Sequence, residues 1–126
     1  MNPADSLPPP PQFPPVSPKA VLDCSALRAE LGQVTLLDVR RKLAFDTAKA
    51  VIKGATWRDP EAVAQWAAEL PKERPVVVYC KYGFEVSLFV ATALRERGFN
   101  ARSLNGGIAA WLAADGPTDP VKGDKP

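Results

Sequence analysis

The sequence predicts an α/β fold in which helices cover both faces of a mostly parallel sheet. Residues 34–39 and 76–79 are apolar without polar alternation, which is typical of strands buried on both faces. Stretches with helical spacing lie between such runs, and the connections are short. With 126 residues, of which 46% are hydrophobic, the chain suits one compact domain with a single core.

The first predicted helix precedes the strand at residues 34–39. Asp23 is a suitable N-cap, and Gly32 supplies the residue that ends the helix. Three side chains share one face of this helix at helical spacing: Cys24, Leu27 and Leu31. We therefore interpret Cys24 as a core residue.

Residues 51–57 follow, and they predict one short strand with a kink at Gly54. Asp59, Pro60 and Glu61 then form a helix start, with a cap, a proline at the first helical position and an acid in the first turn. The expected buried face of this helix consists of Val63, Trp66, Ala67 and Leu70.

The second half of the chain repeats the alternation. The strand at residues 76–79 leads through a short loop into a helix over residues 85–97, which Gly98 can end. Residues 100–104 predict the next strand. A turn with positive φ at Gly106 and Gly107 leads into a last helix over residues 108–114.

Composition excludes several kinds of site. Histidine is absent, which rules out Cys-His pairs, Ser-His-Asp triads and histidine metal ligands. The two cysteines lie too far apart in sequence for a zinc site, and we expect no cofactor. The net charge of +2 comes from interspersed charges of both signs, so we expect no nucleic-acid or membrane partner.

The ends of the chain differ from its middle. Eight of the first 18 residues are proline, which predicts a disordered tail over residues 1–18. This tail is either solvated or a docking peptide for an unknown partner with an aromatic groove. We expect the folded domain over residues 19–117 and a second disordered tail over residues 118–126. Nothing before Lys19 resembles a signal peptide, so we expect a cytoplasmic protein with free cysteines.

Cys80 is the strongest candidate for chemistry, because it stands between a buried strand and the loop that opens the next helix. Backbone N–H groups of such a loop, and the first turn of the helix, stabilise an anion and favour thiolate over thiol. Lys81 adds positive charge beside it. The alternative is that Cys80 is a small buried hydrophobe at the end of a core strand.

Four segments, in this order and spacing, resemble a single-domain rhodanese, a sulfurtransferase. They are Leu36-Leu37-Asp38-Val39-Arg40, Gly54-Ala55, Val76-Val77-Val78-Tyr79-Cys80 with its glycine-containing loop, and Leu104-Asn105-Gly106-Gly107-Ile108-Ala109-Ala110-Trp111. The resemblance covers residues 17–117. It implies a rhodanese-like fold with a central, mostly parallel five-stranded sheet and helices on both faces.

The resemblance also implies a mechanism and a site. Cys80 would take a sulfur atom from a small-molecule donor such as thiosulfate, form a persulfide, and pass the sulfur to cyanide or a thiol. The donor would bind along the loop made of Lys81, Tyr82, Gly83, Phe84, Glu85, Val86 and Ser87. Asp38 and Arg40 match positions that organise the floor of the site in this family, although a purely structural salt bridge explains them equally well. We expect a monomer.

The loop departs from the family pattern. Rhodanese loops typically carry arginine five positions after the cysteine, where this chain has Glu85. The phosphatases and arsenate reductases of this fold need arginine six positions after it, where this chain has Val86. We expect Lys81 to supply the missing cation, with Arg58, Arg40 or Arg41 as further sources. Glu85 either pairs with Arg58 or Lys81 or complements the helix dipole.

Three functions therefore stay open. They are sulfur transfer through Cys80, a binding module in which Cys80 is a bystander, and thiol-dependent reduction or hydrolysis of an oxyanion. The Cys80 loop and residues 54–60 also resemble a rhodanese-like subgroup that is associated with bacterial chromate resistance.

Overall fold

A computed structural model of the chain describes residues 20–121 and is built around five parallel strands. Their order across the sheet is β1-β6-β5-β2-β4, so the strand that precedes Cys80 lies in the centre. The strands are β1 (Val21–Leu22), β2 (Thr35–Asp38), β4 (Thr56–Trp57), β5 (Val76–Tyr79) and β6 (Ala101–Leu104). The predicted α/β architecture with a five-stranded sheet is confirmed, and the sheet is wholly parallel.

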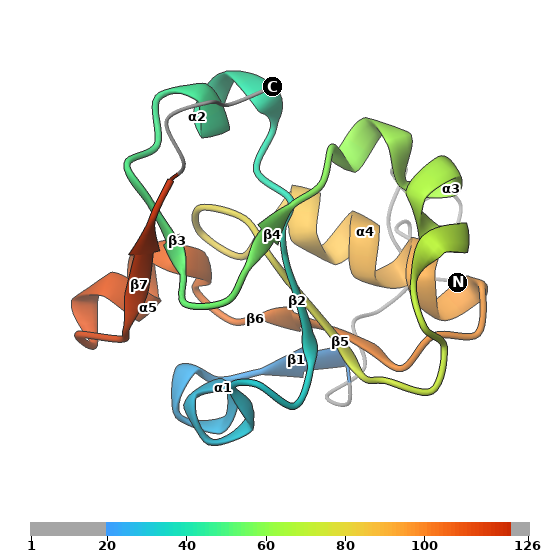
Figure 1. The fold of residues 1–126 in the computed structure, drawn as a ribbon, viewed down its shortest axis with the longest axis horizontal. Coiled ribbons are helices and arrows are strands. Elements are labelled where there is room, and N and C mark those ends of the chain that lie inside the picture. The colour runs from blue at the N-terminus through green and yellow to red at the C-terminus, as the bar shows by residue number, and fades with distance from the viewer. Residues whose placement is uncertain (1–19, 122–126) are drawn as a thin grey trace, which may run out of the picture.

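Helices cover both faces of this sheet (Figure 1). Side chains of β5 alternate between the two faces, as the pleat of a strand requires. Val76 and Val78 pack in a cluster with α3 (Val63–Trp66) and α4 (Glu85–Glu96). Val77 and Tyr79 pack in a second cluster with α1 (Cys24–Glu30) and α5 (Gly107–Ala113). All four side chains are fully buried, which explains the uninterrupted apolar run in the sequence.

The segment after β4 starts as predicted but is not one continuous helix. The carboxylate of Asp59 accepts a hydrogen bond from the N–H of Glu61 at 2.9 Å, which confirms the cap. The helical path then runs through two 3-10 turns, η3 (Pro60–Ala62) and η4 (Ala67–Glu69), on either side of the single turn of α3. Trp66 is buried, and its indole N–H donates to the carbonyl of Asp59 at 2.7 Å.

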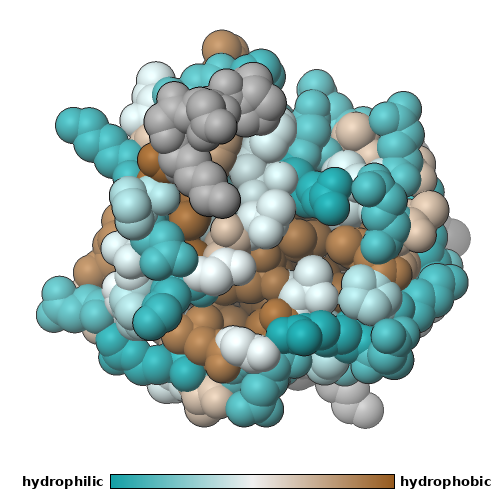
Figure 2. Space-filling view, in the orientation of Figure 1, coloured by the Kyte–Doolittle hydropathy of each residue, from teal (hydrophilic) through white to brown (hydrophobic). Residues whose placement is uncertain are grey.

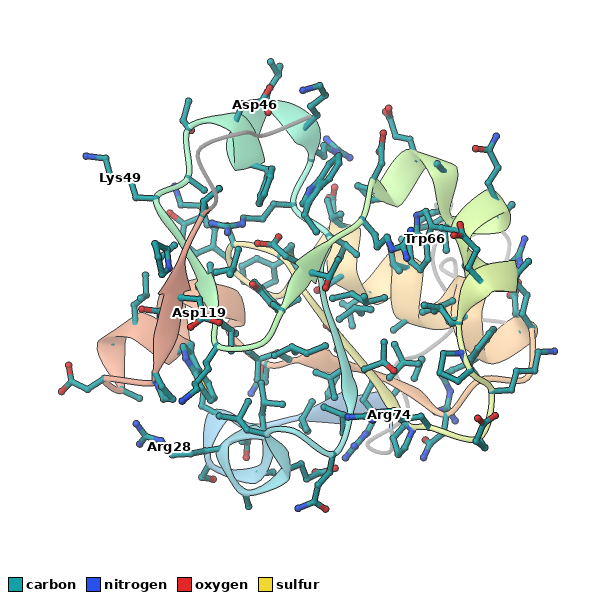
Figure 3. The ribbon with its side chains drawn as sticks, in the orientation of Figure 1. Arg28, Asp46, Lys49, Trp66, Arg74 and Asp119 are labelled. Atoms are coloured by element: carbon teal, nitrogen blue, oxygen red, sulfur yellow. The ribbon has the colours of Figure 1, made fainter. Side chains whose placement is uncertain are left out.

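Residues 51–57 do not form one kinked strand, and this prediction is wrong. Strand β3 (Ala50–Ile52) pairs antiparallel with β7 (Thr118–Pro120) in a separate two-stranded sheet, while β4 joins the central sheet. The two strands separate at Gly54, which adopts a φ of +83°. The N–H of Gly54 donates to the carboxylate of Asp119 at 2.9 Å, and Figure 3 shows Asp119 on β7.

Strand β7 also corrects the expected start of the C-terminal tail. Residues 118–120 were expected to be disordered, but they are part of the fold because they pair with β3. The predictions for residues 1–18 and for the end of the chain from residue 122 fall outside the described residues.

Helix α2 (Lys42–Asp46) was not predicted, because five residues carry too short a pattern to be recognised.

The surface has an uneven distribution of polarity. Figure 2 shows apolar side chains across the middle of the viewed face, between α2 at the top and α1 at the bottom, with polar side chains around them. Within residues 20–121, no helix is long and apolar enough to cross a membrane.

Candidate active site around Cys80

Cys80 lies directly after β5, at the carboxyl edge of the central sheet, where ligands of parallel α/β sheets bind. The cysteine is 7% exposed and forms part of the wall of a cleft of about 460 Å³. One side of the cleft is the loop to α4, and the other side is the connection from β2 into α2. Its lining residues are Arg40, Arg41, Ala44, Cys80, Lys81, Tyr82, Phe84, Glu85 and Val86.

The start of α5 holds the Cys80 loop in place. The N–H groups of Ile108 and Ala109 donate to the carbonyls of Cys80 and Lys81 at 3.0 and 2.9 Å. All described peptide bonds are trans, so each N–H points opposite to the carbonyl of the same peptide unit. The N–H groups of Lys81 and Tyr82 therefore point away from α5.

Gly83 and Gly107 allow the loop and α5 to approach this closely. Gly83 has a φ of +77°, and a Cβ atom on it would lie 2.7 Å from the carbonyl oxygen of Leu104. Gly107 has a φ of +61°, and a Cβ atom on it would lie 2.5 Å from the carbonyl oxygen of Cys80. Neither position can hold a larger residue without movement of the backbone.

Backbone N–H groups make this loop a site for an anion. Among the residues that the structure describes, the N–H groups of residues 81–86 have no hydrogen-bond acceptor. The last two of them belong to the first turn of α4, which contributes the positive end of a twelve-residue helix. Unpaired donors at a helix start stabilise a thiolate or a bound anion.

Two buried hydroxyl groups lie behind Cys80. The Sγ atom of Cys80 is 3.3 Å from the Oγ atom of Ser87 in α4, and the hydroxyl of Ser103 in β6 donates to the same Oγ atom at 2.8 Å. Ser87 and Ser103 are 0% and 1% exposed. The sequence predicted Ser87 in the site, as part of the loop. Ser103 was missed, because β6 reads Ala-Arg-Ser-Leu and contains no apolar run against which a serine would stand out.

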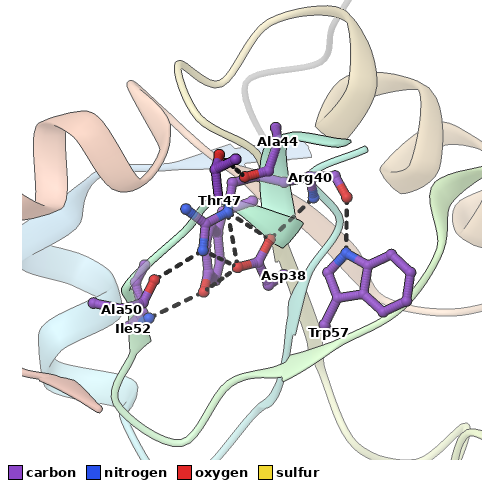
Figure 4. A network of polar contacts seen from close by, with 8 residues as sticks. Asp38, Arg40, Ala44, Thr47, Ala50, Ile52 and Trp57 are labelled. Atoms are coloured by element: carbon purple, nitrogen blue, oxygen red, sulfur yellow. Dashed lines mark hydrogen bonds and ion pairs between the residues drawn. The ribbon is translucent and has the colours of Figure 1, made fainter. Parts of the chain in front are cut away.

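Asp38 and Arg40 form a buried ion pair beside the cleft (Figure 4). The Nε atom of Arg40 donates to both oxygens of Asp38, at 3.0 and 2.9 Å, and a terminal nitrogen donates to the carbonyl of Ala50. The hydroxyl of Tyr79 donates to Asp38 at 3.1 Å. Burial and the Asp38 charge raise the pKa of Tyr79 well above its ordinary value, so it stays a neutral donor.

This network favours the structural interpretation of the ion pair. The Arg40 guanidinium is held by Asp38 and β3, although the residue also lines the cleft. Its own carbonyl accepts a hydrogen bond from the indole N–H of Trp57 at 2.8 Å. The pair thus joins β2, β3, β4 and β5 at the edge of the sheet where the cleft opens.

The structure does not bring Arg58 into the cleft. Its guanidinium lies 3.8 Å from the carboxylate of Glu69, and it is not among the lining residues. The expected pairing of Glu85 with Arg58 or Lys81 is also absent from the described part of the chain. The Nζ atom of Lys81 instead lies over the ring of Tyr82, 5.4 Å from the ring centroid.

Arg41 is the better placed arginine. It is exposed, lines the cleft opposite the Cys80 loop, and has no ion-pair partner within residues 20–121. Ala44 lines the same wall and was missed because α2 was not predicted. The mouth also carries two exposed aromatic rings, since Tyr82 and Phe84 are 54% and 70% exposed.

Within the described residues, no group of three carboxylate, thiol or imidazole side chains could hold a metal ion. The site therefore offers one thiol, backbone donors, two hydroxyls and charges from Arg41, Lys81 and Glu85. That set suits a nucleophilic thiolate that exchanges a group with an anionic or polar ligand.

Residues 23–114 match the family model of the rhodanese-like domain. The chain is 33% identical over 87 residues to "Thiosulfate sulfurtransferase GlpE" of Shewanella oneidensis, a match over 68% of this chain and 83% of that protein. It is 50% identical over 44 residues to a "tRNA sulfurtransferase" of Desulfurococcus amylolyticus. That match covers 35% of this chain and only 9% of the longer protein.

Solved structures give the same fold. The crystal structure of the Alr3790 protein from Anabaena sp. is 32% identical with a TM-score of 0.68, over 79% of this chain and 82% of that one. A full-length protein from Lactobacillus plantarum is 26% identical with a TM-score of 0.75, over 81% of this chain and 88% of that one.

Proposed function

Because this chain belongs to the rhodanese-like domain family, we propose that it is a sulfurtransferase that works through a persulfide on Cys80. One observation carries the proposal. Cys80 lines the cleft at the carboxyl edge of the sheet, within a loop whose N–H groups have no acceptor in the described residues. Cys24 on α1 lacks such surroundings, because it is only partly buried and packs against the cluster that contains Leu27.

In the first step, the Cys80 thiolate attacks the outer sulfur of the donor. A new S–S bond forms to Cys80 while the S–S bond within the donor breaks, and its electron pair leaves with sulfite if the donor is thiosulfate. The persulfide on Cys80 carries the negative charge that the thiolate brought. The N–H groups of the loop stabilise this charge before and after the transfer.

In the second step, a thiolate or cyanide attacks the outer sulfur of the persulfide. The S–S bond to Cys80 breaks, the sulfur leaves on the acceptor, and the Cys80 thiolate returns. We infer that donor and acceptor are small molecules, because the cleft is about 460 Å³ and is open at its mouth. We also infer that one chain is sufficient for activity, and the molar mass in solution would test this.

The charges of the cleft favour a donor with less charge than thiosulfate. Glu85 stands among the lining residues and opposes a dianion, while Arg41 on the other wall attracts a single negative group. The exposed rings of Tyr82 and Phe84 offer apolar contact to an organic substituent. An organic persulfide or thiosulfonate fits this combination better than an inorganic dianion.

Intact-mass measurement after incubation with a sulfane-sulfur donor tests the proposal. We expect the full chain and a Cys24→Ser variant to gain the mass of one sulfur atom, and a Cys80→Ser variant to gain none. Cyanide or a thiol should remove the added mass. Absence of the adduct with thiosulfate and with an organic persulfide would rule out sulfur transfer by Cys80.

Turnover assays beside the mass measurement separate the other two functions that the sequence left open. A binding module would show no adduct and no turnover. An oxyanion reductase or phosphatase would show turnover of arsenate or a phosphate ester without a sulfur adduct, although Val86 replaces the arginine that such enzymes need.

A further inference from the structure

Ser103 lies in β6, 23 positions after Cys80 in the sequence, yet its hydroxyl reaches the hydroxyl that contacts the Cys80 thiol. Its backbone is fixed between two strands, opposite Val78 of β5 and Val21 of β1. Its side chain faces α4, on the side of the sheet where Ala101 also points. The pairing of β6 with its two neighbours therefore fixes the backbone position of Ser103.

The hydroxyl at this position needs an explanation. Ser103 is 1% exposed, and a buried hydroxyl is unfavourable unless it forms a hydrogen bond. Ala101, two residues earlier on the same face, is fully buried and apolar, so packing alone would be served by a small apolar residue. Within residues 20–121, the hydroxyl of Ser103 has a single hydrogen-bond partner, the Oγ atom of Ser87.

The hydrogen bonds that join Cys80, Ser87 and Ser103 show how Ser103 can act on the thiol. The Oγ atom of Ser87 accepts from the thiol of Cys80 at 3.3 Å and from Ser103 at 2.8 Å, which occupies both of its lone pairs. When Cys80 loses its proton, the hydroxyl of Ser87 can turn and donate to the sulfur. Ser103 continues to donate to Ser87 in both states, and a hydroxyl that accepts a hydrogen bond becomes a stronger donor.

We propose that Ser103 is a positioning residue that stabilises the Cys80 thiolate through Ser87. The proposal deepens the proposed function, on which its importance for sulfur transfer rests. We call the two hydrogen bonds from Ser103 to Ser87 and between Ser87 and Cys80 the relay. The relay places a neutral donor behind the sulfur, on the side opposite to solvent. The loop in front of the sulfur carries Glu85 where a cation is typical. It leaves the cleft itself free for the donor molecule.

The test measures how much thiolate forms at each pH, which needs no sulfur donor. All variants carry Cys24→Ser, so that the ultraviolet absorbance of thiolate reports Cys80 alone. We expect Ser87→Ala to raise the pH midpoint of thiolate formation by about 1–2 units, and Ser103→Ala to raise it by about 0.5–1 unit. Ser103→Thr keeps the hydroxyl and should leave the midpoint unchanged.

A double variant tests whether Ser103 acts through Ser87. We expect Ser87→Ala with Ser103→Ala to shift the midpoint no further than Ser87→Ala alone. Thr35→Val removes a hydroxyl from β2 at the far end of the sheet and serves as a control without a shift. The proposal is overturned if Ser103→Ala leaves the midpoint unchanged, or if its shift adds fully to that of Ser87→Ala.

These outcomes are independent of the sulfur adduct. A shifted midpoint in a protein that never gains sulfur would retain the relay and reject sulfur transfer. A sulfur adduct with unshifted midpoints would retain sulfur transfer and reject the relay.

Discussion

Glu85 at the start of α4 is exposed, lines the cleft, and has no cationic partner among residues 20–121. We expect Glu85→Arg to raise kcat/KM for thiosulfate by about ten- to a hundredfold, because the change removes one repulsion of the dianion and adds one attraction. Glu96→Arg makes the same change at the other end of α4 and should have little effect. An unchanged efficiency in the Glu85 variant would show that the side chain points away from the bound donor.

Arg41 and Arg58 both follow strands at the carboxyl edge of the sheet, but only Arg41 lines the cleft. We expect Arg41→Gln to raise KM for an anionic donor by roughly fivefold or more, as loss of a charged contact in a half-enclosed site does. Arg58→Gln removes the same charge outside the cleft and is the matched control. Equal effects of the two substitutions in steady-state kinetics would contradict a direct contact from Arg41.

The two cysteines should differ in reactivity. Burial, and then the charge of Asp23, raise the pKa of Cys24 above its ordinary value. Only the thiolate reacts with alkylating reagents, so Cys24 should react slowly at neutral pH and faster only as the pH rises past that raised value. Cys80 should react first when labelling by a small reagent is followed by mass. Faster labelling of Cys24 at neutral pH would argue against an activated Cys80.

At the scale of elements, the sequence predicted strands that are buried on both faces, because residues 34–39 and 76–79 are uninterrupted apolar runs. It predicted the Asp59 cap and the turns at Gly98 and Gly106 from local backbone requirements. It could not assign residues 51–57 to two sheets, because the two or three strand residues on each side of Gly54 do not specify which strand they pair with. Helix α2 was not predicted because it is only five residues long, and Ala44 of the cleft wall was missed for the same reason.

The contact between the Cys80 loop and α5 depends on Gly83. We expect Gly83→Ala to lower the free energy of unfolding by roughly 2–5 kcal/mol, because a Cβ atom there meets backbone atoms at 2.7 Å as well as an unfavourable positive φ. Gly32→Ala is the matched control. Gly32 has a similar φ of +85° with no atom within 4 Å of an added Cβ, so that variant should lose only about 1 kcal/mol in urea unfolding.

A larger loss for Gly32→Ala than for Gly83→Ala would contradict the close approach of the loop and α5. The Gly83 variant should also transfer sulfur more slowly under conditions in which it is still fully folded. Displacement of the loop would move the N–H groups that are expected to bind the sulfur donor.

Across the whole molecule, the site consists of residues that the sequence separates. Ser103 and Arg41 lie in different segments from Cys80, and they come together because parallel strands end at one edge of the sheet. The sequence indicated that edge through Asp38 and Cys80. It could not indicate which polar residues of neighbouring strands face inward. A shift of one residue in the register of a strand moves every side chain to the other face of the sheet. Arg58, which follows the edge strand β4, lies 3.8 Å from Glu69 and is not among the residues that line the cleft.

The small sheet of β3 and β7 supports this edge from outside. The carbonyl of Ala50 in β3 accepts from Arg40, and the N–H of Ile52 donates to the hydroxyl of Tyr79, the residue before Cys80. Strand β7 pairs with β3 along its whole length, and the Asp119 carboxylate accepts from the N–H of Gly54. Loss of β7 should therefore loosen both β3 and the Asp38–Arg40 network.

Truncation at each end of the chain tests whether the C-terminal segment stabilises the domain more than the N-terminal segment does. We expect deletion of residues 118–126 to lower the free energy of unfolding by about 1–3 kcal/mol and to reduce sulfur transfer, because the ladder with β3 is lost. Deletion of residues 1–18 should cost less than about 0.5 kcal/mol, as their proline-rich sequence predicts. Urea unfolding of both variants measures this, and Asp119→Ala should fall between them. Equal losses from both ends would mean that the N-terminal segment packs on the domain, or that β7 does not support the site.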